Sequence, residues 1–243
     1  MSLAGLMFLS LAAGLAAGEE KMVEADGLRV IFSDGAALSQ DGGEIVVLRT
    51  AASFKELFHQ SVEKATVHVR SVDRRDMGEM FHFQERTLPS GRRVIVSQRI
   101  ANIAEMMVRS RGCQVEGMTF GEKGDYEVKI AGLSGEKFER VLAHELVHVL
   151  VRETHGDGAN LFLNEGIAEY LAGKQFPSEV QHDRGDSKTS NAVLRPYVEG
   201  LDFCRRHASD ARFAAFFTEQ LNHPVTSSRE LEEIWEHADA PSR

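Results

Sequence analysis

Cysteine, proline and net positive charge are all scarce in this chain, and each shortage excludes a class of protein. Five prolines in 243 residues, with no low-complexity tract and no internal repeat, leave no obvious linker between domains. The formal net charge of −9 argues against nucleic acid as a partner, because phosphate binding needs a basic surface. The nucleophile elbow GxSxG, the Walker-type phosphate loop and the dinucleotide fingerprint GxGxxG are also missing.

Cys113 and Cys204 are the only cysteines. They are too few and too far apart for a cysteine-rich zinc cage. In an exported protein the pair can close one disulfide across a long loop. Two unrelated buried thiols fit the sequence equally well, so both interpretations stay open.

The N-terminus carries the longest apolar run, from Leu3 to Gly18, which ends in the small residues Ala16-Ala17-Gly18. Sixteen residues are short for a bilayer span, and small residues suit a signal peptidase. We therefore predict a signal peptide over residues 1–18, export to the periplasm or medium, and no membrane span after its removal. The segment has no Lys or Arg before its apolar part, so an uncleaved anchor or a buried helix is the alternative.

The remaining residues, 19–243, are predicted to form a single domain. Hydrophobic residues make up 42% and charged residues 27%, as in soluble globular proteins. Short β-branched runs predict strands at Leu28–Phe32, Ala65–Val69, Val94–Ser97 and Tyr126–Ile130, with Ile45–Leu48 as a further candidate. We expect an α+β fold with a mixed sheet lobe over about residues 19–133 and a mainly helical lobe over about residues 134–243.

Helical patterns dominate the second lobe. Ser134 suits a helix N-cap and Glu136 the first turn, so a helix is predicted from Gly135 to about Arg152. A second helix is predicted at Asn164–Ala172, with Gly173 as its C′ glycine. Further helices are predicted at Ser53–Val62, Asn191–His207, Asp210–Leu221 and Arg229–His237.

The segment His144-Glu145-Leu146-Val147-His148 carries the clearest chemical signal. Residues four apart on a helix lie nearly on one face, so both imidazoles can reach one Zn²⁺ at about 2.0–2.1 Å. Glu145 then lies beside the metal, where it can take a proton from a water molecule. Apolar residues surround the motif, and buried imidazoles need partners, which a shared metal supplies.

The third ligand decides the kind of site. A histidine ligand six positions after His148 is excluded, because that position is Thr154 and His155 comes one residue late. Glu165 lies at the start of the second predicted helix, where a carboxylate can complete a tetrahedral site with one position left for water. The alternative for Glu165 is an ordinary solvated helix charge.

With His144, Glu145, His148 and Asn164-Glu165-Gly166, the chain resembles the gluzincin metallopeptidases, which include thermolysin and the zinc aminopeptidases. The resemblance covers roughly residues 134–205. It implies a zincin-like fold with zinc in the cleft between the lobes, zinc ligation by His144, His148 and Glu165, and Glu145 as general base. It further implies that Glu169 orients His144 from outside the ligand set.

Pro196-Tyr197-Val198-Glu199-Gly200 is similar to the Tyr-x-x-Gly segment of the aminopeptidases. By that resemblance Tyr197 would donate a hydrogen bond to the oxyanion, with an ordinary core tyrosine as the alternative. Tyr170, His155 and His182 are the reserve candidates. Tyr126–Ile130 is predicted to be the sheet-edge strand that pairs with an extended substrate.

Two departures from the aminopeptidases matter. Only 16 residues separate His148 from Glu165, fewer than in those enzymes, and their glycine-rich, amine-gripping segment is absent. The sequence therefore predicts a zinc-dependent peptidase acting on a peptide or protein, with no support for exopeptidase specificity. The alternatives are a zinc-holding module that binds peptides or proteins without hydrolysis, and a structural domain with a chance motif and no metal.

Overall fold

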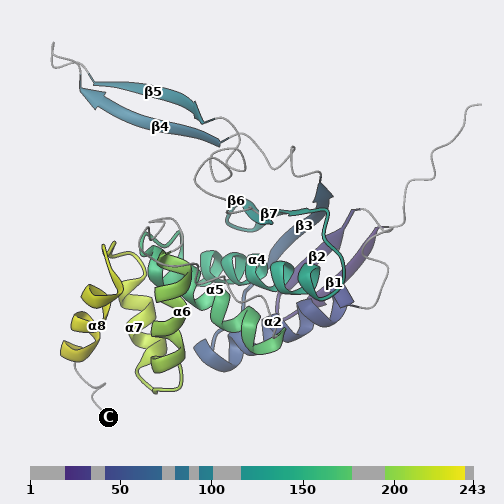
Figure 1. Cartoon of the computed structure of the whole chain (residues 1–243). Coiled ribbons are helices and arrows are strands. Elements are labelled where there is room, and N and C mark those ends of the chain that lie inside the picture. Colours follow the sequence, from purple (N-terminus) through teal and green to yellow (C-terminus); the bar gives the residue numbers. More distant parts are fainter. Residues whose placement is uncertain are drawn as a thin grey trace, which may run out of the picture.

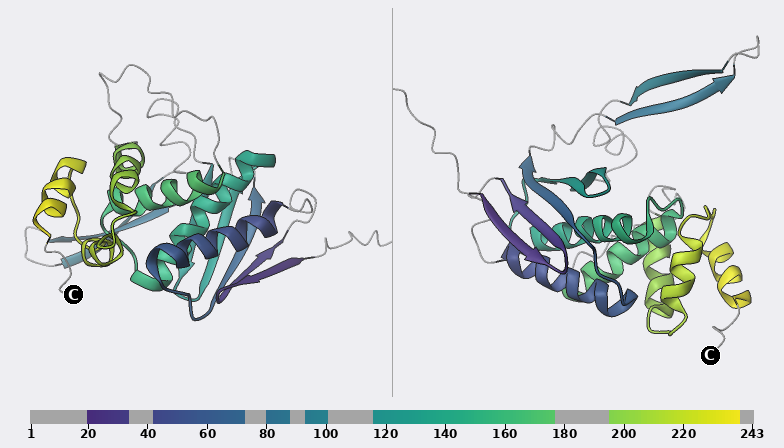
Figure 2. Two further views of the ribbon diagram at one scale, coloured as in Figure 1. Left: turned by 90° about the horizontal axis from the view of Figure 1, so that it is seen from below. Right: turned by 180° about the vertical axis from the view of Figure 1, so that it is seen from behind.

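The sheet that organises the molecule has five strands and mixed direction (Figure 1). The computed structural model describes residues 20–33, 42–72, 80–87, 93–100, 116–176 and 195–238. The strand order is β1-β2-β3-β7-β6, formed by β1 (Lys21–Ala25), β2 (Leu28–Phe32), β3 (Ala65–Val72), β7 (Asp125–Ala131) and β6 (Gly117–Glu122). A separate two-stranded sheet, β4 (Met80–Thr87) with β5 (Arg93–Ile100), lies away from the other elements (Figures 1 and 2).

The strands are connected by one tight turn, one helix and further pairing across the sheet. Asp26 and Gly27 both have positive φ, the conformation of a two-residue hairpin turn, and they join the antiparallel strands β1 and β2. Strands β2, β3 and β7 are parallel neighbours, and helix α2 (Gly42–Phe58) connects β2 to β3. Strand β6 pairs antiparallel with β7 and is the edge strand on that side of the sheet.

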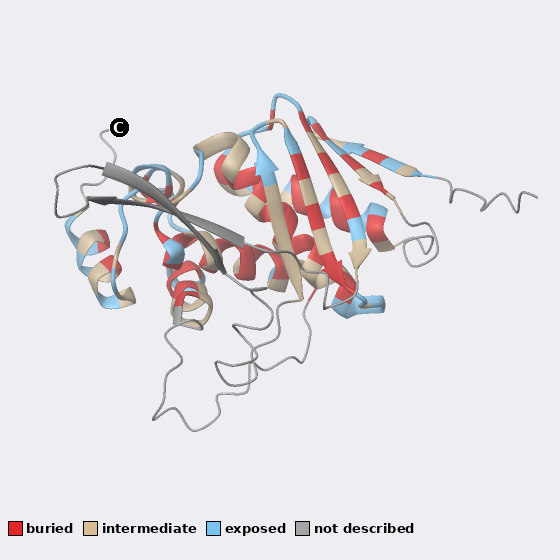
Figure 3. Ribbon diagram, turned by 90° about the horizontal axis from the view of Figure 1, so that it is seen from above, coloured by how far each residue is buried: buried red, intermediate tan, exposed pale blue. Residues whose placement is uncertain are grey.

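One face of the sheet is buried against helices. Alternate residues of β2, β3 and β7 are buried, as a period of two requires, and they join α2 and helix α4 (Gly135–His155) in one core (Figure 3). Charged pairs such as Arg70–Glu127 lie on the other face. Helices α5 (Leu161–Gln175), α6 (Arg195–His207), α7 (Phe213–Gln220) and α8 (Ser228–His237) complete the described helices.

These elements confirm the coarse prediction of an α+β protein. Strand β2 matches its predicted bounds, β3, β5 and β7 extend theirs, and helices α4, α6, α7 and α8 agree with theirs within a few residues. Among the described residues no helix is long and apolar enough to cross a membrane. The predicted signal peptide, Cys113 and His182 lie outside the described residues. Cys204 is a buried free thiol.

Three assignments are wrong. Ile45–Leu48 belongs to α2, whose buried residues Val46, Val47, Thr50, Ala51 and Phe54 follow a helical period. Helix α5 is also predicted within a few residues, and it begins at Leu161 because the side chain of Asn160 caps it by accepting from the N–H of Leu163. The second wrong assignment is Gly173, which is not a C′ residue because α5 continues through it to Gln175.

The sheet edge is the third. Tyr126–Ile130 lies in β7, which is an interior strand because β3 pairs on one side and β6 on the other. The edge strand next to α4 is β6, whose sequence, Gly-Met-Thr-Phe-Gly-Glu, has glycines at positions 117 and 121 and little β-branched content. Its strand conformation comes from pairing with β7, and this is a tertiary effect that local propensity does not contain.

Candidate metal centre

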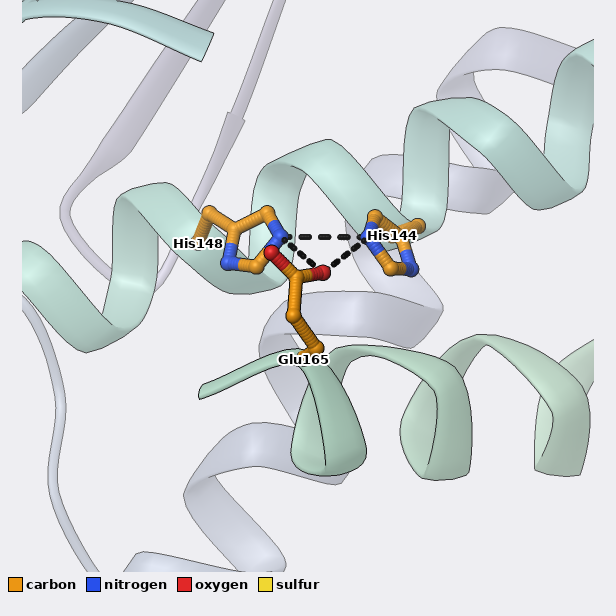
Figure 4. A group of neighbouring side chains, drawn as sticks. All are labelled: His144, His148 and Glu165. Carbon is orange, nitrogen blue, oxygen red and sulfur yellow. Dashed lines mark hydrogen bonds and ion pairs between the residues drawn. The ribbon is translucent and has the colours of Figure 1, made fainter. Parts of the chain in front are cut away.

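His144 and His148 lie one turn apart on α4 and turn their rings toward each other (Figure 4). Their Nε2 atoms are 3.1 Å apart. The helix around them is buried on its other sides by Leu142, Leu146 and Val149, which fix it against the core. The spacing of four residues therefore brings two nitrogen ligands together, as predicted.

Glu165 lies in the second turn of α5 and points its carboxylate at both imidazoles (Figure 4). Its Oε2 is 3.3 Å from the Nε2 of His144 and 3.4 Å from the Nε2 of His148. A tetrahedron with corners about 2.0–2.1 Å from its centre has edges of roughly 3.3–3.4 Å. The three atoms thus have the separations of one face of such a tetrahedron, so His144, His148 and Glu165 can bind a metal ion. We call these three residues the metal group.

The outer nitrogens of both imidazoles are also bonded. The Nδ1 of His144 is 3.3 Å from Oε1 of Glu169, and the Nδ1 of His148 is 3.1 Å from Oδ1 of Asn164. An oxygen acceptor at Nδ1 places the proton there and leaves the Nε2 lone pair for a metal. Arg140 in turn donates to Oε2 of Glu169 at 2.6 Å, so the orienting carboxylate is itself held in place.

The buried charges at the site are consistent with a cation. Oε2 of Glu165 is buried, and among the described residues no donor lies in hydrogen-bonding geometry to it. Burial raises the pKa of this carboxyl, but its electrostatic interactions with the nearby His148 and His144 outweigh burial and hold the pKa well below its ordinary value. A buried, ionised acceptor without a donor is costly unless a cation satisfies it, so the donor set fits a divalent metal.

Tyr197 stacks on His144 from helix α6, with ring centroids 6.1 Å apart and planes inclined by 13°. Burial raises the pKa of its phenol, and the negative charges of Glu165, Glu145 and Glu169 raise it further. The hydroxyl is therefore neutral and can donate a hydrogen bond at the metal group.

Glu145 lies beside the metal group and turns its side chain toward strand β6. The hydroxyl of Thr119 donates to its Oε2 at 2.7 Å. Gly117, two residues earlier on β6, has no side chain, and a Cβ built there would lie 2.6 Å from Oε1 of Glu145. Glu145 is 6% exposed, so this carboxylate is held between helix and strand.

The structure therefore brings together six predicted residues: His144, Glu145, His148, Glu165, Glu169 and Tyr197. Of the reserves, Tyr170 lines a cavity with Arg140 and Glu169, and His155 packs on Phe58 and Phe217 away from the group.

Sequence reasoning missed the roles of Asn164, Arg140, Thr119 and Gly117. Asn164 stood within the matched Asn-Glu-Gly segment, and Arg140 lies one turn before His144, so both had a local signal. Thr119 and Gly117 had none, because their role depends on how β6 packs on α4.

No protein-family model, no curated protein and no solved structure matched the chain.

Proposed function

We propose that this chain is a zinc-dependent peptidase of the gluzincin type, with a zincin-like fold. The observation that carries the proposal is the triangle of two Nε2 atoms and one carboxylate oxygen, with sides of 3.1, 3.3 and 3.4 Å. Two histidines and one glutamate form a ligand set that catalytic zinc uses, since it keeps one position for water. Glu145 follows the first ligand directly, where a general base is needed.

Each residue has a distinct task in the proposed reaction. His144, His148 and Glu165 would hold the zinc ion, which would lower the pKa of a water molecule and polarise the carbonyl of a peptide bond. Glu145 accepts a proton from the attacking water and delivers it to the leaving amine. Tyr197 donates to the oxygen that becomes negative, and Glu169 and Asn164 keep the two imidazoles in the ligating tautomer.

Strand β6 supplies a surface for an extended peptide. The N–H of Ala131 donates to the carbonyl of Glu116, so these two residues form a hydrogen-bonded pair. Such pairs alternate in antiparallel strands, and the backbone groups of Gly117 and Thr119 therefore face away from β7. Among the described strands none pairs with this side of β6, so a substrate strand can add here next to Glu145, where it would replace the 3.4 Å contact from Arg152 to the carbonyl of Thr119.

The experiment combines metal analysis with hydrolysis of a peptide library and of an unfolded protein. We expect about one zinc per chain and cleavage by the wild type. Glu145→Gln should keep the zinc and lose hydrolysis by about 10²–10⁴-fold, because the general base is gone. Glu136→Gln, an exposed residue of the same helix, is the matched control and should behave as the wild type.

The other outcomes separate the rival functions. Bound zinc with equal, background rates for the wild type and Glu145→Gln would assign a binding module that does not hydrolyse. Absence of zinc after purification and after reconstitution would leave a structural domain with a chance motif. Library peptides with free and with blocked termini distinguish exopeptidase from endopeptidase cleavage.

A further inference from the structure

Two residues of strand β6 contact the carboxylate of Glu145. Residues two apart on a strand share a face, so Gly117 and Thr119 both lie toward α4. A Cβ at Gly117 would lie 2.6 Å from Oε1 and 2.8 Å from Cγ of Glu145. The hydroxyl of Thr119 lies 2.7 Å from Oε2. Strand and side chain are therefore in direct contact at both carboxylate oxygens.

The hydrogen bond from Thr119 has a defined direction. The hydroxyl has one proton, and its nearer acceptor is Oε2 of Glu145 at 2.7 Å, whereas the backbone carbonyl of Glu145 is 3.2 Å away. Hydrogen bonds to a carboxylate are the stronger kind, so the hydroxyl of Thr119 donates its proton toward Oε2 and not toward the carbonyl. This bond occupies one oxygen of Glu145 and limits rotation of the side chain.

The strand that delivers this hydroxyl is itself fixed to α4. Lys137 pairs with Glu116 at 2.5 Å, and Glu153 accepts from the N–H of Gly124 at 2.5 Å. Arg152 donates to the carbonyl of Thr119 at 3.4 Å. Contacts at both ends of the β6–β7 hairpin therefore set the position of Thr119 relative to the helix.

We propose that Thr119 is a positioning residue that orients the carboxylate of Glu145 for proton transfer. This inference rests on the proposed peptidase function. The hydroxyl of Thr119 holds Oε2 by a hydrogen bond. The other oxygen, Oε1, lies over the backbone of Gly117 and is left to accept the proton from the attacking water. The backbone of Thr119 lies on the side of β6 with which no described strand pairs, so one residue contacts the general base and borders the expected path of the peptide.

Two matched pairs of proteins test the role of the hydroxyl. Thr119→Val replaces the hydroxyl of the wild type by a methyl group, and Thr119→Ala differs from Thr119→Ser only by lacking the hydroxyl. In each pair we expect kcat to be about 10–100-fold lower without the hydroxyl, because misplacing a catalytic group by about 1 Å has an effect of this size. KM and zinc content should stay within about threefold of the wild type.

The control is Thr154→Val on α4, whose hydroxyl donates to the carbonyl of Leu150 at 2.7 Å. It removes a threonine hydrogen bond within the helix that carries Glu145, and it should leave kcat unchanged. A second readout needs no activity: urea unfolding of the metal-free wild type, Thr119→Val, Glu145→Gln and the double variant. We expect the two substitutions to be coupled. The unfolding equilibrium constant of the double variant should differ at least threefold from the value that independent effects of Thr119→Val and Glu145→Gln would give.

The outcomes separate this inference from the proposed function. If the wild type cleaves and Glu145→Gln does not, yet the variants without the hydroxyl retain full kcat, Thr119 has no positioning role. Additive unfolding effects of Thr119→Val and Glu145→Gln would also overturn it. If the wild type and Glu145→Gln hydrolyse equally poorly, the peptidase proposal fails first and this inference fails with it.

Discussion

The backbones of Gly166 and Gly200 touch where helix α5 crosses helix α6. A Cβ built on Gly166 would lie 2.4 Å from the carbonyl carbon of Gly200, and a Cβ on Gly200 would lie 2.1 Å from the carbonyl oxygen of Phe162. Glu165 precedes one glycine directly, and Tyr197 lies one turn before the other. This close crossing therefore brings the phenol from α6 to the metal group on α4 and α5.

Gly200→Ala is expected to destabilise the protein and to disturb this crossing. The added methyl group collides with backbone, which cannot move as a flexible side chain would. Overpacking of this kind lowers the free energy of unfolding by about 1–3 kcal/mol. Urea unfolding of the metal-free protein measures the loss.

Gly173→Ala is the matched control for that substitution. Gly173, like Gly200, lies within a helix, in this case α5. A Cβ there would meet only the Arg140 guanidinium, at 3.7 and 3.9 Å, which is ordinary contact. Because alanine is a better helix former than glycine, we expect a gain of about 0.5–1 kcal/mol. Equal losses for Gly173→Ala and Gly200→Ala would show that the contact at the crossing has no special role.

Glu169→Gln is expected to weaken metal binding without removing a ligand. Glu169 accepts from the Nδ1 of His144 and from Arg140, so the amide would orient the imidazole less well and bring less negative charge. Loss of such an outer partner typically costs about 10–100-fold in metal affinity. Competition with a chromogenic chelator measures the zinc dissociation constant.

The control for Glu169→Gln is a second carboxylate–histidine pair. Glu232 contacts the Nε2 of His207 at 2.8 Å, between α8 and α6. Glu232→Gln removes a similar ion pair and should leave zinc affinity unchanged. A zinc affinity for Glu169→Gln within about twofold of the wild type would contradict the orienting role.

The three residues that can bind a metal could be predicted from the sequence because their geometry is local. His144 and His148 need only a helix between them, and Glu165 needs only the next helix to pack alongside. Thr119 could not be found in this way, since it reaches Glu145 across 26 positions through the pairing of β6 with β7. Residue spacing does not record which strand lies at the edge of a sheet.

The same distinction explains the fold predictions. Leu28–Phe32 could be predicted because a short run with β-branched residues favours a strand. In the structure its alternate residues are buried, as this prediction requires. Ile45–Leu48 could not, because a short apolar run suits a strand or a buried helix, and only the longer buried pattern of α2 decides between them. Gly173 resembled a helix end, but α5 continues through it, and a Cβ there would make only ordinary contact with Arg140.

His155 is expected to make the protein less stable in acid. Its ring packs on Phe58 and Phe217, and its Nε2 is buried with no hydrogen-bond partner in the part of the chain that the structure describes. Burial lowers the pKa of this imidazole below its ordinary value of 6.5. The unfolded chain therefore takes up a proton more readily, so the contribution of His155 to stability is present above pH 6.5 and declines as the pH falls.

His155→Phe tests this effect, because phenylalanine fits among the same aromatic rings and does not titrate. We expect the urea midpoint of the wild type to fall between pH 7 and pH 5, and that of His155→Phe to fall less. Both proteins should be measured without metal, so that protonation of the ligands contributes equally. Parallel pH profiles for the two proteins would show that this imidazole is not the group responsible.

Tyr197→Phe is expected to lower kcat while leaving the metal and the fold in place. The ring that stacks on His144 is kept, and only the hydroxyl, held neutral by burial and by the surrounding carboxylates, is lost. Removing one donor to an oxyanion typically lowers kcat by about 10²–10³-fold. Tyr170→Phe is the control, because Tyr170 lies on α5 beside the Arg140–Glu169 pair and has no assigned part in the reaction. Steady-state kinetics with zinc-loaded proteins distinguish the two phenols: a loss confined to Tyr170→Phe would move the oxyanion role to α5, and full activity of both variants would assign it to neither.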